Sequence, residues 1–419
     1  MNYKPSIFKG AICTVCTIIL LGFSIHVFAN DPPAEKKWVG TWGTARQLVE
    51  PNNMPPAPGL TNNTLRQVVA VSIGGKNLRF KFSNEFSTAA VNMKWVQIAV
   101  SKGGSDIDPS TIKTLKFKGK NEVTMEPGKE VTSDEVSFNL SPRMLVAITI
   151  AYGETSPTVT GHPGSRTTSY ILPGDQAAPN TDYSTAVKTD HWYNIVAIDV
   201  ENNNKNAGAV ATFGDSITDG RGSGTNKQNR WPDILAMSLL KDKATQNVGV
   251  LNMGIGGNAV LRGGLGPYAL SRFEHDVLNQ SGIKWVIIFE GVNDLGGAVR
   301  RDSAAVHKIA SDLIVAFEKM ITDAHAKGIK VYGATITPFK KNGYYSIHTE
   351  AARQRVNKWI RTSGKYDAVI DFDKAIRNPA DPEVMLEEVV PGPNANDYLH
   401  LNEKGYVMMG ESIDTKLFK

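Results

Sequence analysis

The rhythm of apolar and polar positions changes once along the chain. From Trp38 to about Asn204, short apolar runs are separated by turn residues at fairly regular spacing. This spacing is typical of an all-β sandwich, most simply of jelly-roll type. The strands are expected at 65–71, 78–82, 91–100, 136–140, 145–152 and 192–200.

Two glycines, Gly74-Gly75, separate the first two predicted strands. Glycine reaches the positive φ that a two-residue hairpin turn requires. We therefore expect a hairpin that joins 65–71 to 78–82.

After the polar segment 201–206, short apolar strands alternate with helical segments of ten or more residues. This alternation predicts a parallel sheet covered by helices. A chain of 419 residues is long enough for two domains, so we predict a β-sandwich accessory domain at 30–206 and an α/β domain at 207–419. The α/β strands are expected at 209–213, 248–252, 285–290, 330–336 and 368–371, and the helices at 230–240, 304–327, 348–363 and 402–415.

The first 29 residues have the pattern of a signal peptide. Lys4 and Lys9 precede the apolar stretch 11–28, and the small residue Ala29 suits a cleavage site before Asn30. We expect an exported protein, periplasmic or extracellular, with no stable membrane insertion after cleavage. The alternative is a membrane anchor, because about 18 apolar residues nearly span a bilayer.

Cysteine usage and charge each exclude a class of function. Both cysteines, Cys13 and Cys16, lie in the predicted signal peptide, so the mature chain would have neither disulfides nor thiolate metal sites. The formal charge is +5, but Lys and Arg are scattered and form no basic stripe. We expect no nucleic-acid partner.

A candidate nucleophile follows the first strand of the α/β region. Ser216 lies in Gly214-Asp215-Ser216, so its hydroxyl is expected at the carboxyl edge of the sheet, where ligands bind in open α/β folds. A serine needs a base, and the base needs an acid that orients it. His400 and Asp397, in Asp397-Tyr398-Leu399-His400, supply both.

A bland interpretation exists for each motif. Ser216 is also a suitable serine for capping a helix. Asp397 or Asn402 is likewise suited to begin a helix, which would leave His400 merely exposed.

Two further motifs lie between these, Asn252-Met253-Gly254-Ile255-Gly256-Gly257-Asn258 and Gly291-Val292-Asn293-Asp294. With them, the region from about Ala207 to the C-terminus resembles the SGNH, or GDSL, hydrolase family in four ordered blocks. The resemblance implies a flavodoxin-like parallel sheet, serine esterase chemistry without a cofactor, and a triad of Ser216, His400 and Asp397. It also implies an oxyanion hole formed by the N–H groups of Ser216 and Gly257, with Gly256 as the alternative, and by the Asn293 side-chain amide.

The neighbouring polar residues are expected to play supporting roles. We interpret Asp215 and Asp294 as hydrogen-bonding groups that fix the motif loops. The remaining histidines are scattered and show no metal-ligand spacing, so no metal is expected. They are His162, His191, His275, His307, His325 and His348.

The segments 262–268 and 338–345 are expected to border the cleft, and their aromatic and cationic residues suit a sugar-like ligand. Tyr344 and Tyr345 are equally consistent with ordinary loop packing. The aromatic residues of the β region suit either sugar stacking or a core, and the core is the commoner outcome for tryptophan in a sandwich. They are Trp38, Trp42, Trp192 and Tyr193.

These observations predict an exported serine esterase that removes short acyl groups, most simply acetyl, from carbohydrate. Its partner would be acylated carbohydrate or another small ester. The alternatives are a lipase, lysophospholipase or thioesterase acting on lipid esters, and a glycan O-acetyltransferase. A carbohydrate-binding protein with an idle α/β region is the alternative outside the enzymes.

Overall fold

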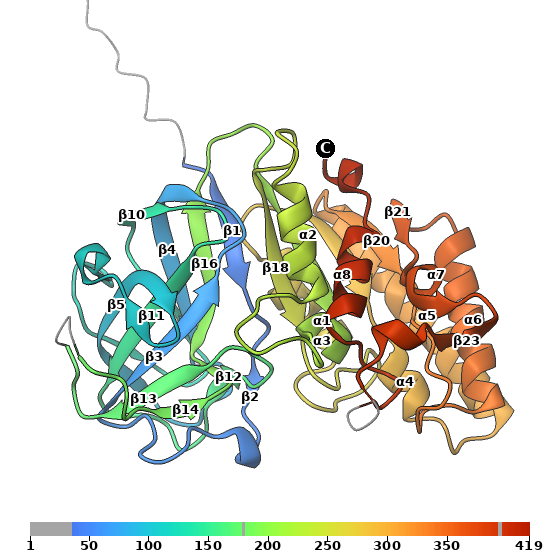
Figure 1. The fold of residues 1–419 in the computed structure, drawn as a ribbon, viewed down its shortest axis with the longest axis horizontal. Coiled ribbons are helices and arrows are strands. Elements are labelled where there is room, and N and C mark those ends of the chain that lie inside the picture. Colours follow the sequence, from blue (N-terminus) through green and yellow to red (C-terminus); the bar gives the residue numbers. More distant parts are fainter. Residues whose placement is uncertain (1–35, 178–180, 393–395) are drawn as a thin grey trace, which may run out of the picture. The chain divides into compact units, whose positions relative to one another are not determined.

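The computed structural model describes residues 36–177, 181–392 and 396–419, and Lys36–Lys419 form one compact unit (Figure 1). The predicted signal peptide, with both cysteines, lies outside the described residues. Among the described helices, none is both long and apolar enough to cross a membrane. The division into an accessory and a catalytic domain stays a prediction.

The N-terminal region consists of antiparallel sheets, blue to green in Figure 1. One sheet has the order β1-β16-β4-β10 and a second has the order β14-β13-β3-β11-β5-β6, while β15-β12-β2 forms a third, smaller sheet. Every strand pair in this region is antiparallel, which confirms the all-β prediction, whereas the jelly-roll connectivity stays a prediction. The longer strands are β1 (Trp38–Gly43), β3 (Asn63–Ala70), β4 (Gly75–Ser83), β5 (Val91–Gly103), β10 (Val136–Leu140), β11 (Leu145–Tyr152), β13 (Ser169–Pro173) and β16 (Ile195–Glu201). The shorter ones are β2 (Gln47–Leu48), β6 (Asp106–Ile107), β7 (Lys113–Thr114), β8 (Val123–Met125), β9 (Glu130–Thr132), β12 (Thr160–His162), β14 (Val187–Thr189) and β15 (Trp192–Tyr193).

The predicted hairpin at Gly74-Gly75 is wrong. The strand before it, β3, pairs with β11 and β13, whereas β4 pairs with β16 and β10 in the other sheet. Neither glycine has a positive φ. A Cβ on Gly74 would lie 2.4 Å from the Leu140 carbonyl oxygen, and one on Gly75 would lie 2.1 Å from Val200. The glycines therefore allow close backbone packing where the chain passes between sheets, which their sequence alone does not distinguish from a turn.

The C-terminal region contains a five-stranded parallel sheet with the order β18-β17-β19-β20-β21. Counted along the chain, this is the order 2-1-3-4-5 of flavodoxin-like sheets, as predicted. The strands are β17 (Gly208–Gly214), β18 (Val248–Gly254), β19 (Ile283–Phe289), β20 (Lys330–Ala334) and β21 (Ala368–Ile370). The longer helices are α2 (Trp231–Leu239), α5 (Ser303–Ala326), α6 (Ile347–Thr362) and α8 (Glu403–Glu411). The shorter ones are α1 (Ser216–Asp219), α3 (Ala269–Phe273), α4 (Val292–Gly296) and α7 (Phe372–Ile376).

Both faces of the parallel sheet are buried, which explains its continuous apolar strands. Along β17, Ala209, Ala211 and Phe213 join one apolar cluster, and Val210 joins another with residues of α2 and α8. The first cluster also contains residues of α5, α6 and the antiparallel sheets. The core is therefore continuous between the two regions.

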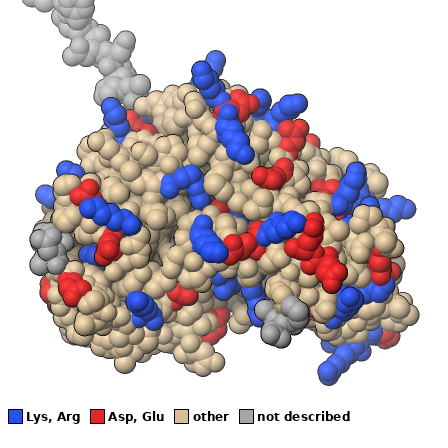
Figure 2. All heavy atoms as spheres, in the orientation of Figure 1, with Lys and Arg blue, Asp and Glu red and all other residues tan. Residues whose placement is uncertain are grey.

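The first strand of the β region, β1, joins the two regions by packing against β18. A Cβ on Gly40 would lie 2.9 Å from Leu251, while one on Gly43 would lie 2.7 Å from Met253. Gly40 and Gly43 thus let the two strands approach closely. Charged residues of both signs are interspersed over the face in Figure 2, as the scattered sequence suggests.

Candidate active site

Ser216 lies at the carboxyl end of β17, at the first position of the short helix α1. Asp215 caps this helix, because its Oδ1 accepts a hydrogen bond of 2.9 Å from the N–H of Ile217. The cap is therefore Asp215 and not the serine, whose hydroxyl is left for other contacts. Gly220 ends the helix with φ of 99°, a conformation that favours glycine.

The nucleophile turn packs tightly against neighbouring strands. A Cβ on Gly214 would lie 2.1 Å from the Thr218 hydroxyl, and one on Gly254 would lie 2.3 Å from the Asp219 backbone nitrogen. Both motif glycines are thus required by close approach. They fix the position of α1 over the edge of the sheet.

The structure brings Ser216, His400 and Asp397 together, although 184 positions separate the serine from the histidine. Ser216 Oγ lies 2.7 Å from His400 Nε2, and His400 Nδ1 lies 2.6 Å from Asp397 Oδ2. Ser216 and His400 are each only 6% exposed. A proton can therefore pass from the hydroxyl to an imidazole whose other nitrogen is held by a carboxylate.

The loop around Asp397 holds the carboxylate in place. Its Oδ1 accepts hydrogen bonds from the N–H groups of Leu399, at 3.0 Å, and His400, at 2.9 Å. Partial burial works to raise the pKa of Asp397, but the His400 side chain and these N–H groups outweigh it and hold the pKa well below the usual range. Asn402, and not Asp397, caps the following helix α8.

Three donors suited to an oxyanion lie at the same edge of the sheet. Within the described residues, the N–H groups of Ser216 and Gly257 have no acceptor, and Gly257 has φ of 70°. The Asn293 amide donates one N–H to the Asn258 carbonyl, at 2.7 Å, which leaves its second N–H free. Gly256 lines the same cavity but does not have a positive φ.

Tyr344 fixes the orientation of the Asn293 amide. The tyrosine hydroxyl donates to Asn293 Oδ1 at 3.1 Å, so the two amide atoms are distinguished by a donor on one side and the Asn258 carbonyl on the other. Tyr344 lines the cavity next to Ser216, whereas the Tyr345 hydroxyl bonds to Glu383, at 2.7 Å. Tyr344 therefore borders the cavity, whereas Tyr345 has the contacts of ordinary packing.

The two supporting carboxylates have the predicted loop-fixing bonds. Asp215 caps α1, and Asp294 accepts hydrogen bonds from the N–H groups of Val260, at 2.8 Å, and Leu261, at 3.0 Å. Burial raises the pKa of Asp215 to about 7, and burial also raises the pKa of Asp294.

Sequence reasoning missed a buried arginine that joins two of the motifs and contacts the residue before a third. Arg272, 4% exposed, donates to the carbonyl of Gly214 at 3.0 Å, to that of Met253 at 2.8 Å and to the Asn258 side chain at 2.9 Å. It also contacts Glu290 at 3.3 Å. Burial, together with the nearby Asp215 carboxylate, raises the pKa of Glu290 well above its usual range despite this arginine.

The β region supplies a second buried network beside the nucleophile helix. His162 in β12 places Nε2 2.9 Å from Asp219 Oδ1 and Nδ1 2.8 Å from the Ala45 carbonyl oxygen, so each ring nitrogen faces an oxygen. Arg166 approaches the other Asp219 oxygen at 3.3 Å. Burial opposes the charge on Asp219, but His162 and Arg166 outweigh it and lower its pKa.

A cavity of about 450 Å³ opens over Ser216 and His400. Its α/β side includes Asn293, Gly257 and Tyr344. The remainder comes from the β region and from loops, and it is mostly polar: Gln47, Glu50, Asn53, Pro163, Gly164, Arg166, His191, Asp219, Arg221, Gly256, Leu265 and Leu399. Both predicted cleft segments contribute, through Leu265 and Tyr344.

The aromatic residues of the β region belong mostly to the core. Trp42, Trp192 and Tyr193 are buried, and the two tryptophan rings meet edge to face with centroids 5.0 Å apart. Trp38 is partly exposed and packs beneath the Arg79 guanidinium. The sugar-stacking interpretation is therefore not favoured for the buried three.

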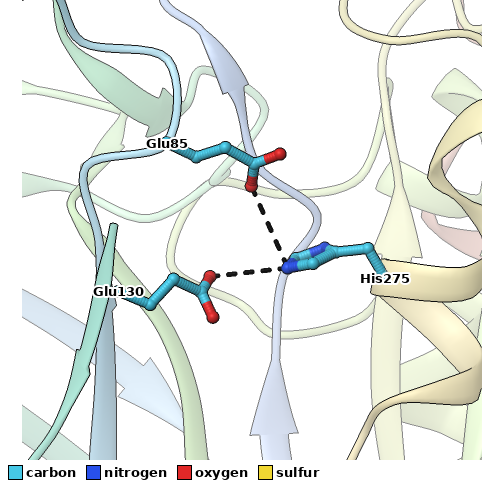
Figure 3. Close-up of side chains that lie close together, drawn as sticks. All are labelled: Glu85, Glu130 and His275. Atoms are coloured by element: carbon cyan, nitrogen blue, oxygen red, sulfur yellow. Dashed lines mark ion pairs between the residues drawn. The ribbon is translucent and has the colours of Figure 1, made fainter. Parts of the chain in front are cut away.

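A cluster with the ligand types of a metal site lies elsewhere (Figure 3). Glu85, Glu130 and His275 place one ligand atom each within 4.8 Å of one another. Arg46, 4% exposed, already lies between them: Nη2 is 2.6 Å from both Glu130 Oε1 and His275 Nδ1, and Nε donates to Glu85. The guanidinium supplies the positive charge that a metal would otherwise provide.

A serine hydroxyl, an imidazole and a carboxylate aligned at the carboxyl edge of a 2-1-3-4-5 parallel sheet are the arrangement of the serine hydrolases. The model of the GDSL-like lipase/acylhydrolase family matches residues 212–408. Residues 212–408 therefore form a GDSL-like acylhydrolase region.

Several solved structures of GDSL proteins and esterases align with about half of the chain. A putative lipolytic protein of the G-D-S-L family from Desulfitobacterium hafniense DCB-2 is 22% identical, over 49% of this chain and 96% of its own, with a TM-score of 0.36. The acetyl xylan esterase AlAXEase is 23% identical over 49% and 96%, with a TM-score of 0.35. A putative arylesterase from Agrobacterium tumefaciens str. C58 is 19% identical over 50% and 98%, with a TM-score of 0.36. No curated protein matches the chain.

Proposed function

We propose that the protein is an exported serine esterase that removes short acyl groups, above all acetyl, from carbohydrate. The observation that carries the proposal is the 2.7 Å contact of Ser216 Oγ with His400 Nε2, in a cavity whose lining includes several charged and amide side chains. His400 is the base, and Asp397 orients it and balances its charge.

In the first half of the reaction, Ser216 Oγ bonds to the ester carbonyl carbon as His400 Nε2 takes the serine proton. The carbonyl oxygen becomes an oxyanion, which receives hydrogen bonds from the N–H groups of Ser216 and Gly257 and from the free N–H of Asn293. The bond to the leaving alcohol then breaks, and His400 returns the proton to that alcohol. An acyl group remains on Ser216.

The second half repeats these steps with water. His400 takes a proton from water, the resulting hydroxide bonds to the acyl carbon, and the same donors stabilise the oxyanion. The bond to Ser216 Oγ breaks, and the serine regains its proton from His400. The carboxylic acid is released, so the cycle uses only ester and water.

The preference for a short acyl group on a sugar rests on the cavity. Arg221, Glu50 and Asn53 present charged or amide groups to it, which a long alkyl chain would have to desolvate without return. Leu265 and Leu399 provide apolar surface beside these groups. These groups suit a small acyl group with a hydroxyl-rich alcohol.

The test is hydrolysis of p-nitrophenyl esters from acetate to laurate by the purified protein. We expect a maximum at acetate and a loss of about 10³-fold or more in kcat for Ser216→Ala. Ser238→Ala is the matched control, because Ser238 lies on α2 away from the cavity. A maximum at long chains would indicate a lipase, and full activity in Ser216→Ala would rule out the mechanism.

Export is the second part of the proposal, and it rests on the N-terminal sequence pattern. Cell fractionation with mass spectrometry of the N-terminus is the direct test. We expect a chain that begins at Asn30 outside the cytoplasm. A chain retained in the cytoplasm with its first 29 residues would contradict it.

A further inference from the structure

One side of the cavity over Ser216 comes from the antiparallel β region. The segment after β2 contributes Gln47, Glu50 and Asn53 to the same cavity that contains Ser216 and His400. Both groups face one space, so an ester held at Ser216 has its alcohol portion within a chamber that the β region helps to form. The β region is therefore part of the substrate site.

Glu50 is held in place within this wall. Its two carboxylate oxygens accept hydrogen bonds from the Gln47 amide and, at 2.9 Å, from the Asn53 amide. The backbone is fixed as well, because the Asn53 N–H donates to the Glu50 carbonyl at 2.9 Å and the Tyr193 hydroxyl donates to the Asn53 carbonyl at 2.9 Å. The carboxylate is thus presented at a fixed position.

Glu50 retains capacity for further hydrogen bonds. A carboxylate offers about four acceptor sites, and the two amides occupy two of them. In the described part of the chain, no Lys, Arg or His forms an ion pair with Glu50. The remaining acceptor sites are available to a ligand in the cavity.

Arg221 offers the complementary group. It follows the nucleophile helix, lines the same cavity and is exposed, and within the described residues its guanidinium has no hydrogen-bond or ion-pair partner. A guanidinium only donates, and a carboxylate only accepts. A hydroxyl does both, so a ligand with several hydroxyls satisfies Glu50 and Arg221 together, whereas an alkyl chain satisfies neither.

We propose that Glu50 and Arg221 form a subsite for the hydroxyl groups of the sugar that carries the ester, with Gln47 and Asn53 as positioning residues for Glu50. This inference rests on the proposed esterase function and adds the recognition of the alcohol portion. The subsite lies largely on the β region, so it selects among alcohols and takes no part in the acyl chemistry.

The test compares two acetate esters on the purified full protein: an acetylated xylo-oligosaccharide, whose alcohol has neighbouring hydroxyls, and p-nitrophenyl acetate, whose alcohol has none. The measured quantity is the ratio of the two kcat/KM values. We expect Glu50→Gln to lower this ratio about tenfold, because a hydrogen bond to a charged group becomes one to a neutral group. Glu122→Gln is the matched control, since Glu122 accepts from the Asn92 amide at the surface of the β region, outside the cavity.

Each outcome decides the proposal. An unchanged ratio in a folded Glu50→Gln variant overturns the subsite but leaves the esterase intact. If that variant does not fold, Arg221→Gln replaces an exposed side chain without partners, and an unchanged ratio there also overturns it. If the parent protein cleaves neither ester in a Ser216-dependent way, the proposed function itself is wrong.

Discussion

Removal of the Tyr344 hydroxyl is the smallest change that tests the proposed oxyanion hole. It donates to Asn293 Oδ1 at 3.1 Å, while Asn293 Nδ2 donates to the Asn258 carbonyl at 2.7 Å. Together these bonds hold the second N–H of the amide in one orientation. Tyr344→Phe removes one oxygen atom and leaves the ring in the cavity wall.

The size of the effect follows from the bond that is lost. A neutral hydrogen bond contributes about 0.5–1.5 kcal/mol, which corresponds to a loss of about two- to tenfold in kcat. Removing the donor itself in Asn293→Ala is expected to cost about 10²–10³-fold. The loss in kcat expected for Tyr344→Phe is therefore smaller than that for Asn293→Ala, and it arises through the orientation of the Asn293 amide.

The assay measures kcat and KM for p-nitrophenyl acetate in the parent, both single variants and the double variant. We expect Tyr344→Phe to lower kcat with little change in KM, because the interaction strengthens only when the oxyanion forms. In the Asn293→Ala background the same change should cost less than about twofold. Tyr345→Phe is the matched control, since that hydroxyl bonds to Glu383 instead.

Two results would refute this reasoning. An unchanged kcat in Tyr344→Phe would show that Asn293 does not need the tyrosine to orient its amide. An equal loss in both backgrounds would show that Tyr344 acts by a route independent of Asn293.

Three further predictions concern stability. Arg272→Met should lower the free energy of unfolding by about 3–5 kcal/mol in urea titrations, because it leaves the buried carboxylate of Asp276, 3.0 Å from the guanidinium, without that partner. A loss below about 1 kcal/mol would argue against this role. Burial raises the pKa of Asp215 to about 7 and that of Glu290 well above its usual range, so the folded protein holds protons that the unfolded chain releases. The free energy of unfolding is therefore expected to be greatest at about pH 4–5 and to fall as the pH rises towards 8. Glu290→Gln should flatten this fall, measured as urea midpoints at each pH. EDTA should leave the melting temperature unchanged, because the Arg46 guanidinium already contacts Glu85 and Glu130. Arg46→Met should lower the melting temperature by several degrees. A drop in melting temperature with EDTA would instead indicate a bound metal.

Much of the α/β region could be predicted from the sequence, because its signals are local. Helix 304–327 was expected from its apolar period and is observed at Ser303–Ala326, and the strand 209–213 is observed as Gly208–Gly214. The order of the motifs predicts Ser216 and His400 as partners, and the two side chains lie 2.7 Å apart. The last helix is shorter than predicted and ends at Glu411, although its sequence remains compatible with a helix beyond that point.

The β region was harder to predict, because apolar alternation shows which face of a strand is buried but not which strand lies beside it. Gly74-Gly75 illustrates this: the same pair of residues suits a hairpin turn and a close crossing between sheets, and only the positions of Leu140 and Val200 distinguish them. The strand expected at 192–200 is divided at Asn194, whose φ of 59° interrupts the extended backbone.

The sequence by itself determined the chemistry: a serine, a histidine and an aspartate in ordered motifs, each with its expected place after a strand or in a late loop. Only the tertiary structure decided what surrounds them. Arg272 joins the first two motifs, and Glu50 lines the cavity from the β region, because residues far apart in the chain meet in the folded protein. Such contacts depend on which elements pack against each other, and the apolar periodicity of a strand or helix shows its buried face but not its neighbour.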